Sequence, residues 1–264
     1  MRYSVPEMND ILNLYKERGE TPLERIERFR KRHPEYRNEP LSYAGRLDPL
    51  AEGVLLVLAG DANKERGTYL GLGKEYVFDV LFGFSTDTFD VLGIVDDAVT
   101  RTSHRPVRMP MLMEYVSQWV GSRTQQYPPY SSKPLEGVPL FVKARKNELA
   151  GFELPEHRIE IQAAAVEGTK RVRDTELMIE IEHAIGLVRG DFRQERILHV
   201  WRDTLRVLYG MQFDVVTIRV QCSSGTYVRS LAHELGIQLG MPALALSIMR
   251  TKVGKWKVQS SSRD

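Results

Sequence analysis

The sequence predicts an α+β fold in which a mixed or antiparallel central sheet is flanked by helices. Segments with the alternation of strands are interleaved with segments of helical spacing along the 264 residues. Several strands also lie so close in the chain that hairpins, rather than helices, join them. We expect a single domain over residues 1–258, with an insertion at 169–210 and a disordered polar tail at 259–264.

The first predicted element is a helix over residues 21–37. Thr21 and Glu24 have the spacing of a capping box, and Pro22 suits the first helical position. Its polar face is basic, which indicates either a solvated helix face or an edge that contacts phosphates. The basic residues of this face are Arg25, Arg28, Arg30, Lys31 and Arg32.

Strands and helices alternate through the rest of the chain. The wholly apolar run at 54–59 predicts a buried strand, and we expect the strand at 74–83 to form a hairpin with a return strand at 93–95. The β-branched segment at 213–222 is the clearest strand, and Gly240 is expected to end the helix that follows it. The other predicted elements are a helix at 111–120, an extended segment at 125–132, a short helix or turn at 141–149, a strand at 159–166, helices at 175–185, 193–209 and 227–239, and a last strand at 253–258.

Composition excludes several classes of function. The net charge is only +2, so nucleic-acid binding requires a local basic patch. Cys222 is the only cysteine, which excludes an intrachain disulfide and a cysteine-rich zinc site and fits a cytoplasmic protein. The N-terminus lacks a secretory signal, no apolar run is long enough to span a membrane, and no Gly-x-Gly-x-x-Gly or Walker-type loop is present.

The most informative segment is the loop at residues 44–53. Asp48 lies between Gly45 and Gly53, and directly precedes a proline. An aspartate in such a loop is more often a turn former. The alternative is a carboxylate held at the edge of a packed core, where burial and a charged partner tune its reactivity.

Two further polar residues accompany the predicted strands. Tyr76 lies near the start of the 74–83 strand, and Arg229 lies in the first turn of the 227–239 helix. An arginine there is poorly placed for the helix dipole, which favours a buried carboxylate as its partner. Taken singly, an ordinary strand tyrosine and a surface arginine are the commoner interpretations.

In combination, these motifs resemble those of the TruB-type pseudouridine synthases. The resemblance covers about residues 41–93, 125–145 and 215–250, and it implies a pseudouridine synthase fold with a catalytic cleft. Its motifs come in the family's order: Leu-Asp-Pro-Leu-Ala-x-Gly at 47–53, Lys-x-Tyr at 74–76, Thr-Asp-Thr at 86–88, Pro-Pro-Tyr-Ser at 128–131 and Ser-Gly-Thr-Tyr-x-Arg at 224–229.

The resemblance implies an isomerase that needs no cofactor and no metal. Such enzymes convert uridine 55 in the T-loop of tRNA into pseudouridine. Asp48 is then the nucleophile and Arg229 its countercharge, in a bidentate contact. Tyr76 stacks on the uracil, which must be flipped out of the RNA fold, and accepts or relays the C5 proton.

Substrate contacts are implied for six further residues. Tyr43 stands where the family has a histidine, and Arg46 resembles the Arg-Leu-Asp motif of other pseudouridine synthases, which act on rRNA as well as tRNA. Basic residues would contact phosphates, which positions the RNA without reading its sequence. The implied contacts are Tyr43, Arg46, Lys74, Lys143, Arg145 and Tyr227.

Two other functions stay open. The first is a pseudouridine synthase for another tRNA or rRNA uridine, and the second is a catalytically weak tRNA-binding or folding protein. We further expect a cytoplasmic monomer without the C-terminal PUA-type domain of many TruB proteins. The insertion is interpreted as a solvated helical pair, or as an additional RNA contact through Arg189, Arg193 and Arg196.

Overall fold

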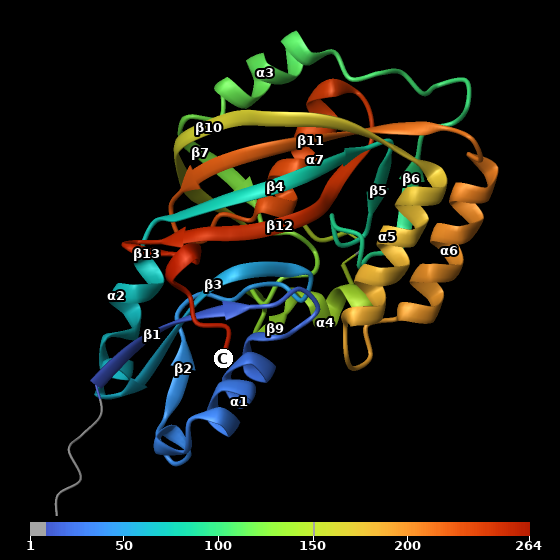
Figure 1. Ribbon diagram of the computed structural model, residues 1–264. Coiled ribbons are helices and arrows are strands. Elements are labelled where there is room, and N and C mark those ends of the chain that lie inside the picture. The colour runs from blue at the N-terminus through green and yellow to red at the C-terminus, as the bar shows by residue number, and fades with distance from the viewer. Residues whose placement is uncertain (1–8, 150) are drawn as a thin grey trace, which may run out of the picture.

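The computed structural model describes residues 9–149 and 151–264. These residues form one large sheet with helices packed around it (Figure 1). The strands of this sheet are β1 (Asn9–Lys16), β2 (Leu41–Tyr43), β3 (Ala51–Gly60), β4 (Lys74–Phe82), β7 (Gly121–Gln126), β10 (Glu156–Arg173), β11 (Gln212–Cys222), β12 (Ala243–Val253) and β13 (Trp256–Lys257). Short ribbons are formed by β5 (Phe84–Thr86) with β6 (Val95–Ala98), and by β8 (Pro134–Leu135) with β9 (Val138–Pro139).

The large sheet is mixed, as predicted. Its strand order is β1-β3-β12-β4-β11-β10-β7, with β2 beside β3 and β13 beside β12. β3 and β12 pair in parallel, whereas β4 is antiparallel to both of its neighbours, β12 and β11. This order places the start of β3 beside the middle of β12, although the two strands are far apart in the sequence.

Helices cover the sheet on more than one side (Figure 1). They are α1 (Pro22–Arg32), α2 (Arg66–Gly71), α3 (Met109–Ser117), α4 (Leu140–Arg145), α5 (Asp174–Leu187), α6 (Gln194–Val207) and α7 (Val228–Leu239). None of the helices within residues 9–149 and 151–264 is long and apolar enough to cross a membrane.

Side chains along β4 point alternately to the two faces of the sheet, and each face belongs to a different core cluster. Phe78 and Val80 belong to the cluster that α3 and α7 cover, whereas Leu81 belongs to the cluster that α5 and α6 cover. The predicted insertion at 169–210 therefore comprises the end of β10 and two helices that pack onto the sheet. Its status as an insertion stays a prediction.

The first helix confirms its predicted start and is shorter than expected. The Thr21 hydroxyl accepts a hydrogen bond from the amide of Glu24, and the Glu24 carboxylate accepts one from the amide of Thr21. The helix ends at Arg32 rather than at residue 37. Pro34 explains the difference, because the residue before a proline is disfavoured in the helical conformation.

Two strand predictions are wrong. The strand at 74–83 does not pair with residues 93–95, since β4 lies between β11 and β12 and the hairpin is formed instead by β5 and β6. The predicted strand at 253–258 is only the short β13, whereas the long strand β12 precedes it. Polar residues within β12, among them Ser247 and Arg250, mask its alternation in the sequence.

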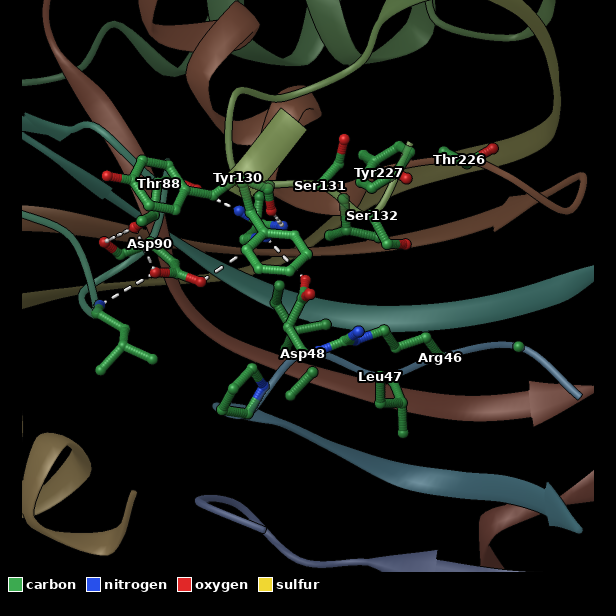
Figure 2. A pocket seen from close by; sticks show the side chains of 18 of the residues that line it. Arg46, Leu47, Asp48, Thr88, Asp90, Tyr130, Ser131, Ser132, Thr226 and Tyr227 are labelled. Atoms are coloured by element: carbon green, nitrogen blue, oxygen red, sulfur yellow. Dashed lines mark hydrogen bonds and ion pairs between the residues drawn. The ribbon is translucent and has the colours of Figure 1, made fainter. Parts of the chain in front are cut away.

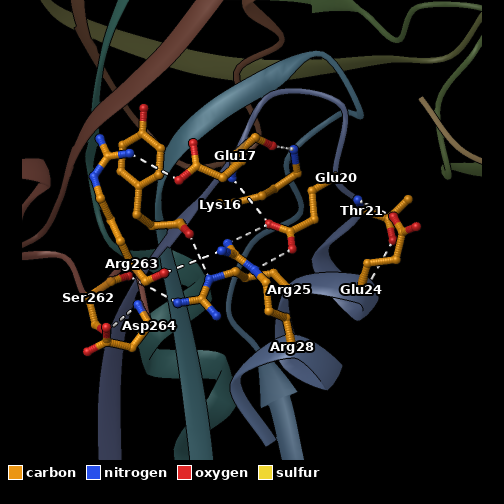
Figure 3. A network of polar contacts seen from close by, with 11 residues as sticks. Lys16, Glu17, Glu20, Thr21, Glu24, Arg25, Arg28, Ser262, Arg263 and Asp264 are labelled. Atoms are coloured by element: carbon orange, nitrogen blue, oxygen red, sulfur yellow. Dashed lines mark hydrogen bonds and ion pairs between the residues drawn. The ribbon is translucent and has the colours of Figure 1, made fainter. Parts of the chain in front are cut away.

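The predicted disorder of residues 259–264 is also wrong, because these residues lie along β1 (Figure 3). The Ser262 carbonyl accepts hydrogen bonds from the amide of Tyr15 (2.7 Å) and from Nη2 of Arg25 (3.1 Å). The Arg263 guanidinium lies 3.7 Å from the centre of the Tyr15 ring. The edge strand β1 offers unpaired backbone groups, and the C-terminal residues satisfy them.

Candidate active site

Asp48 lies in the loop between β2 and β3, and a buried arginine on β12 holds the first half of this loop. Arg250 donates hydrogen bonds from Nη2 to the carbonyl of Gly45 (3.1 Å) and from Nη1 to the carbonyl of Arg46 (3.3 Å). Its Nε donates to the carbonyl of Val54 at 2.7 Å. These contacts fix the backbone on both sides of Asp48 to the central sheet.

A buried lysine holds the second half of the same loop. Nζ of Lys16 on β1 donates to the carbonyls of Pro49 (3.1 Å) and Ala51 (2.5 Å). Burial lowers the pKa of Lys16 from 10.5 to about 7. Sequence reasoning missed both cations, because lysine and arginine are rarely fully buried unless paired and an isolated strand lysine gives no signal of burial.

Gly53 allows the loop to enter the sheet. A Cβ atom built on this glycine would lie 2.3 Å from the carbonyl oxygen of Arg250, and φ is +105°. Both observations require glycine, since an L-residue would be strained and would force β3 away from β12. The second glycine of the sequence motif is therefore a packing requirement.

The Asp48 carboxylate pairs with Arg229 at the start of α7. Nε of Arg229 lies 2.8 Å from Oδ2 of Asp48, and the side chains are 3% and 33% exposed, respectively. The predicted bidentate contact is wrong, because Nη1 donates to the carbonyl of Thr88 and Nη2 to that of Tyr130 (3.3 Å). Each nitrogen of the guanidinium therefore has its own acceptor, which fixes its orientation.

A second carboxylate, Asp90, lies behind the same arginine. Its Oδ2 is 3.7 Å from Nε of Arg229, and its Oδ1 accepts hydrogen bonds from the Thr88 hydroxyl and the amide of Leu92. Burial, assisted by the charge of Asp48, raises the pKa of Asp90. Sequence reasoning did not single out Asp90, although the apolar residues that follow it are a signal of burial.

These groups line a cavity of about 480 Å³, and Figure 2 shows Asp48 facing the segment that carries Tyr130 and Ser131. The polar groups that reach the cavity come from the loop after β2, from β4, from the turn after β5, from residues 130–132, from α4, from the turn before α6, from the start of α7 and from β12. The structure thus brings together all three predicted catalytic residues. The predicted site residues in the cavity wall are Arg46, Asp48, Lys74, Tyr76, Arg145, Tyr227 and Arg229.

Two aromatic residues of the cavity have perturbed hydroxyl groups. Tyr76 on β4 is 7% exposed, and burial raises its pKa. Burial also raises the pKa of Tyr227, and the nearby Asp48 adds to this effect. Both phenols are therefore neutral at neutral pH, so Tyr76 is suited to stacking and to relaying a proton rather than to acting as a phenolate.

The cations of the cavity wall differ in their availability. Nζ of Lys74 donates to the carbonyls of Leu70 (2.9 Å) and Leu72 (2.6 Å), and burial lowers the pKa of Lys74 to about 8. The exposed side chain of Arg46 has no hydrogen bond or ion pair with any residue in the described parts of the chain. Arg46 is thus the cation most available to a phosphate.

Two predicted substrate contacts lie outside the cavity. Tyr43 on β2 packs with the apolar cluster of β1 and α1, because its pairing with Val57 turns the ring towards that cluster. Lys143 on α4 is 8% exposed, and its Nζ is 2.6 Å from the Glu136 carboxylate. Neither residue lines the cavity, and contact of either one with RNA outside it stays a prediction.

The basic face of α1 is largely occupied by contacts within the protein. Arg25 is buried, and its Nε donates to the carbonyl of Tyr15 at 2.7 Å. Arg28 forms a double hydrogen bond with Glu20, at 2.9 and 3.1 Å. These residues stabilise the packing of α1. Arg25 and Arg28 are therefore already occupied and are not candidates for contacting phosphates.

Residues 9–149 and 151–264 contain no candidate metal site. No group of three or more His, Cys, Asp or Glu side chains has an arrangement suited to a metal ion there. The cavity itself presents an aspartate with an arginine partner, next to a buried tyrosine. This combination on a mixed sheet matches the arrangement that the resemblance to the pseudouridine synthases led us to expect.

Comparison with known families agrees with this class. The model of the TruB family pseudouridylate synthase (N terminal domain) matches residues 34–187, more than half of the chain. The chain therefore belongs to the TruB family. The matched region includes Asp48, Tyr76 and Asp90, whereas Arg229 lies beyond it.

Individual relatives support the same assignment. The tRNA pseudouridine synthase B of Nitratidesulfovibrio vulgaris (strain Hildenborough) is 35% identical over 213 residues, which are 80% of this chain and 54% of that protein. The tRNA pseudouridine synthase B of Ligilactobacillus salivarius is 29% identical and is matched over 95% of this chain and 69% of its own length. The chain thus spans about half to two thirds of the length of these relatives.

Solved structures show the same fold. A chain in the crystal structure of a Cbf5-Nop10-Gar1 complex superposes with a TM-score of 0.57 and 20% identity, over 95% of this chain and 50% of that chain. A chain in the structure of an H/ACA RNP bound to a substrate RNA containing 2′-deoxyuridine gives a TM-score of 0.54 and 19% identity, over 94% of this chain and 48% of that chain. The predicted fold class is confirmed.

Proposed function

We propose that this chain is a tRNA pseudouridine synthase that isomerises uridine 55 of the T-loop, acting as a cytoplasmic monomer. The observation that carries the proposal is the pair of Asp48 and Arg229. One side of the carboxylate contacts a buried guanidinium, and the other side is open to a cavity of about 480 Å³. The curated relatives named tRNA pseudouridine synthase B support tRNA as the substrate class.

The proposed reaction begins with a uridine that has been flipped into the cavity. Asp48 acts as the nucleophile on the sugar or the base, and the bond between N1 and C1′ breaks. The uracil then turns, a bond forms between C5 and the same C1′, and the bond between the Asp48 carboxylate and the substrate breaks, which regenerates the free carboxylate. C5 loses its proton while N1 gains one, so the product is an isomer of the substrate and needs no redox cofactor.

Each neighbouring residue has a separate part in this proposal. Arg229 compensates the charge of Asp48 and orients the carboxylate, because its other nitrogens are held by backbone carbonyls. Tyr76 stacks on the uracil and relays the C5 proton through its neutral hydroxyl. Removing a base from the RNA stack costs roughly a few kcal/mol, and stacking on Tyr76 offsets part of this cost.

Contacts beyond the catalytic residues position the RNA. Arg46 at the rim is exposed and has no partner in the described residues, so it is proposed to bind a phosphate. Tyr227 lines the cavity at the start of α7 and is proposed to pack against the flipped nucleotide. Such contacts fix the register of the RNA and carry little sequence information.

Mapping of the modified position tests the proposal. The purified chain is incubated with unmodified tRNA transcripts and with rRNA fragments, and pseudouridine is located by carbodiimide labelling at each uridine. We expect modification at position 55 and none in a matched tRNA with cytidine at that position. Modification of a different uridine would overturn the assigned target, and the absence of pseudouridine in every RNA would overturn the activity.

A further inference from the structure

The turn between α5 and α6 reaches the wall of the active-site cavity. Phe192 and Arg193 lie in this turn, and both line the cavity that contains Asp48. The helices themselves pack on the sheet through the cluster that contains Leu177 and Trp201. The segment that the sequence analysis interpreted as a solvated helical pair therefore also contributes side chains to the site.

Arg193 makes two kinds of contact inside this wall. Its Nη1 and Nη2 lie 2.6 and 3.3 Å from the two carboxylate oxygens of Asp87, which is the forked arrangement typical of strong arginine–carboxylate pairs. Its Cζ lies 4.7 Å from the centre of the Tyr130 ring. The backbone of Arg193 has φ +67°, a conformation that residues with a side chain adopt at an energetic cost.

A second arginine extends from α4 and contacts the α5–α6 turn. Nη2 of Arg145, at the end of α4, donates to the carbonyl of Asp191 at 3.1 Å. Its Cζ lies 5.8 Å from the centre of the Phe192 ring. The α5–α6 turn and the segment from Tyr130 to α4 are thus tied together by reciprocal arginine contacts.

The partners of Arg193 adjoin the backbone acceptors of the catalytic arginine. Arg229 donates to the carbonyl of Thr88, the residue after Asp87, and to the carbonyl of Tyr130 itself. Arg193 therefore braces both segments that hold the guanidinium of Arg229.

We propose that Arg193 is a positioning residue of the active site. It fixes the Asp87–Thr88 turn and Tyr130, and through their carbonyls it holds Arg229 in register with Asp48. This inference rests on the proposed pseudouridine synthase activity. It assigns the α5–α6 segment a part in turnover, whereas the RNA phosphates are bound elsewhere, at Arg46.

Kinetics on the full chain separate positioning from RNA binding. We expect Arg193→Ala and Asp87→Asn each to lower kcat by about tenfold or more, because displacements of about 1 Å in a site have effects of this order. The Kd for tRNA should change less than about threefold, and Arg193→Lys should recover part of the rate. The double variant Arg193→Ala/Asp87→Asn should have a kcat no lower than that of the less active single variant, because both changes break the same contact. The matched control is Arg206→Ala at the far end of α6, whose side chain is 79% exposed.

Hydrogen exchange gives a second readout that does not depend on activity. The amides of Leu140 and Phe141 donate to the carbonyls of Lys133 and Ser131, in the segment that Tyr130 begins. We expect these amides to exchange faster in Arg193→Ala and to be unchanged in Arg206→Ala, with thermal unfolding showing that both variants are folded.

The results that would overturn the inference are distinct from those that would overturn the activity. Wild-type kcat in Arg193→Ala, a loss confined to tRNA affinity, or unchanged exchange at Leu140 and Phe141 would each contradict positioning. If the wild-type chain forms no pseudouridine, the proposed function fails, while the exchange measurement still decides whether Arg193 braces this segment.

Discussion

Nε of Arg229 lies 2.8 Å from Oδ2 of Asp48, although the two residues are 181 positions apart in the chain. The arginine is almost fully buried, whereas a third of the Asp48 side chain is exposed. A carboxylate placed in this way has a fixed charge partner on one side and access to a ligand on the other. The sheet order creates this relationship, because β12 joins the Asp48 loop to the strands that precede α7.

Replacing Arg229 by methionine should destabilise the fold as well as abolish activity. The buried Asp90 would lose its cationic neighbour, and breaking a buried pair in this way costs about 3 kcal/mol of unfolding free energy. Adding Asp90→Asn should restore roughly half of this loss, because the unpaired charge is then removed. Urea unfolding of the single and double variants measures both effects, and a fully stable Arg229→Met would contradict the buried pair.

Gly53→Ala should lower the unfolding free energy by about 3 kcal/mol, because the new Cβ meets the Arg250 carbonyl and the backbone has positive φ. Gly67→Ala is the matched control, since nothing lies within 4 Å of its Cβ position in α2. There we expect a gain of about 0.5–1 kcal/mol from helix propensity. Equal effects at the two glycines, in thermal or urea unfolding, would show that the close approach of β3 and β12 does not require glycine.

Lys16→Met should change the pH dependence of stability. Burial lowers the pKa of Lys16 to about 7 in the folded chain, whereas the ordinary value is 10.5. Between these values the unfolded chain holds a proton that the folded chain has lost, so this group makes wild-type stability rise with pH above 7. Below pH 7 both states are protonated, and the unfavourable contribution of Lys16 is constant.

The comparison of the two proteins at pH 7 and pH 9 isolates this group. The unfolding free energy of the wild type should gain about 2 kcal/mol relative to Lys16→Met over this range. Other titrating groups contribute equally to both proteins and cancel in the difference. Parallel pH profiles would contradict the lowered pKa of Lys16.

Arg46→Ala should weaken tRNA binding several-fold and reduce the slope of log K against log salt by about 1, as expected for the loss of one phosphate contact. The measurement is a salt titration of tRNA affinity, with Arg206→Ala as the control for a general loss of positive charge. An unchanged salt slope for Arg46→Ala would show that this exposed guanidinium does not contact the RNA backbone.

Much of the fold follows from sequence patterns that are local. The capping box of α1, the apolar run of β3 and the alternation of β11 each indicate their element without tertiary information. Strand β12 was missed because apolar clusters cover both of its faces, and buried polar residues such as Arg250 interrupt its pattern. The order of the strands in the sheet depends on contacts between distant segments. For this reason the sequence did not reveal that β4 lies between β11 and β12 and forms no hairpin with residues 93–95.

The same distinction applies to the site. Asp48, Tyr76 and Arg229 were found because their motifs resemble those of the TruB-type pseudouridine synthases, and the structure brings them to one cavity. Arg250 and Lys16 were not found, because a buried cation that binds only carbonyls looks like a surface residue in the sequence. The position of Tyr43 in a motif likewise does not reveal which face of β2 its ring occupies, so its packing against the β1 and α1 cluster was not foreseen.

The most direct test of the central claim is Asp48→Asn, which retains the shape of the side chain and removes its charge. The account predicts that this variant binds tRNA with wild-type affinity, within about threefold, and forms pseudouridine at least about 10³-fold more slowly. Pseudouridine formation in single-turnover assays, measured beside the Kd, separates the two effects. Pseudouridine formed by Asp48→Asn at the wild-type rate would contradict the assignment of Asp48 as the nucleophile.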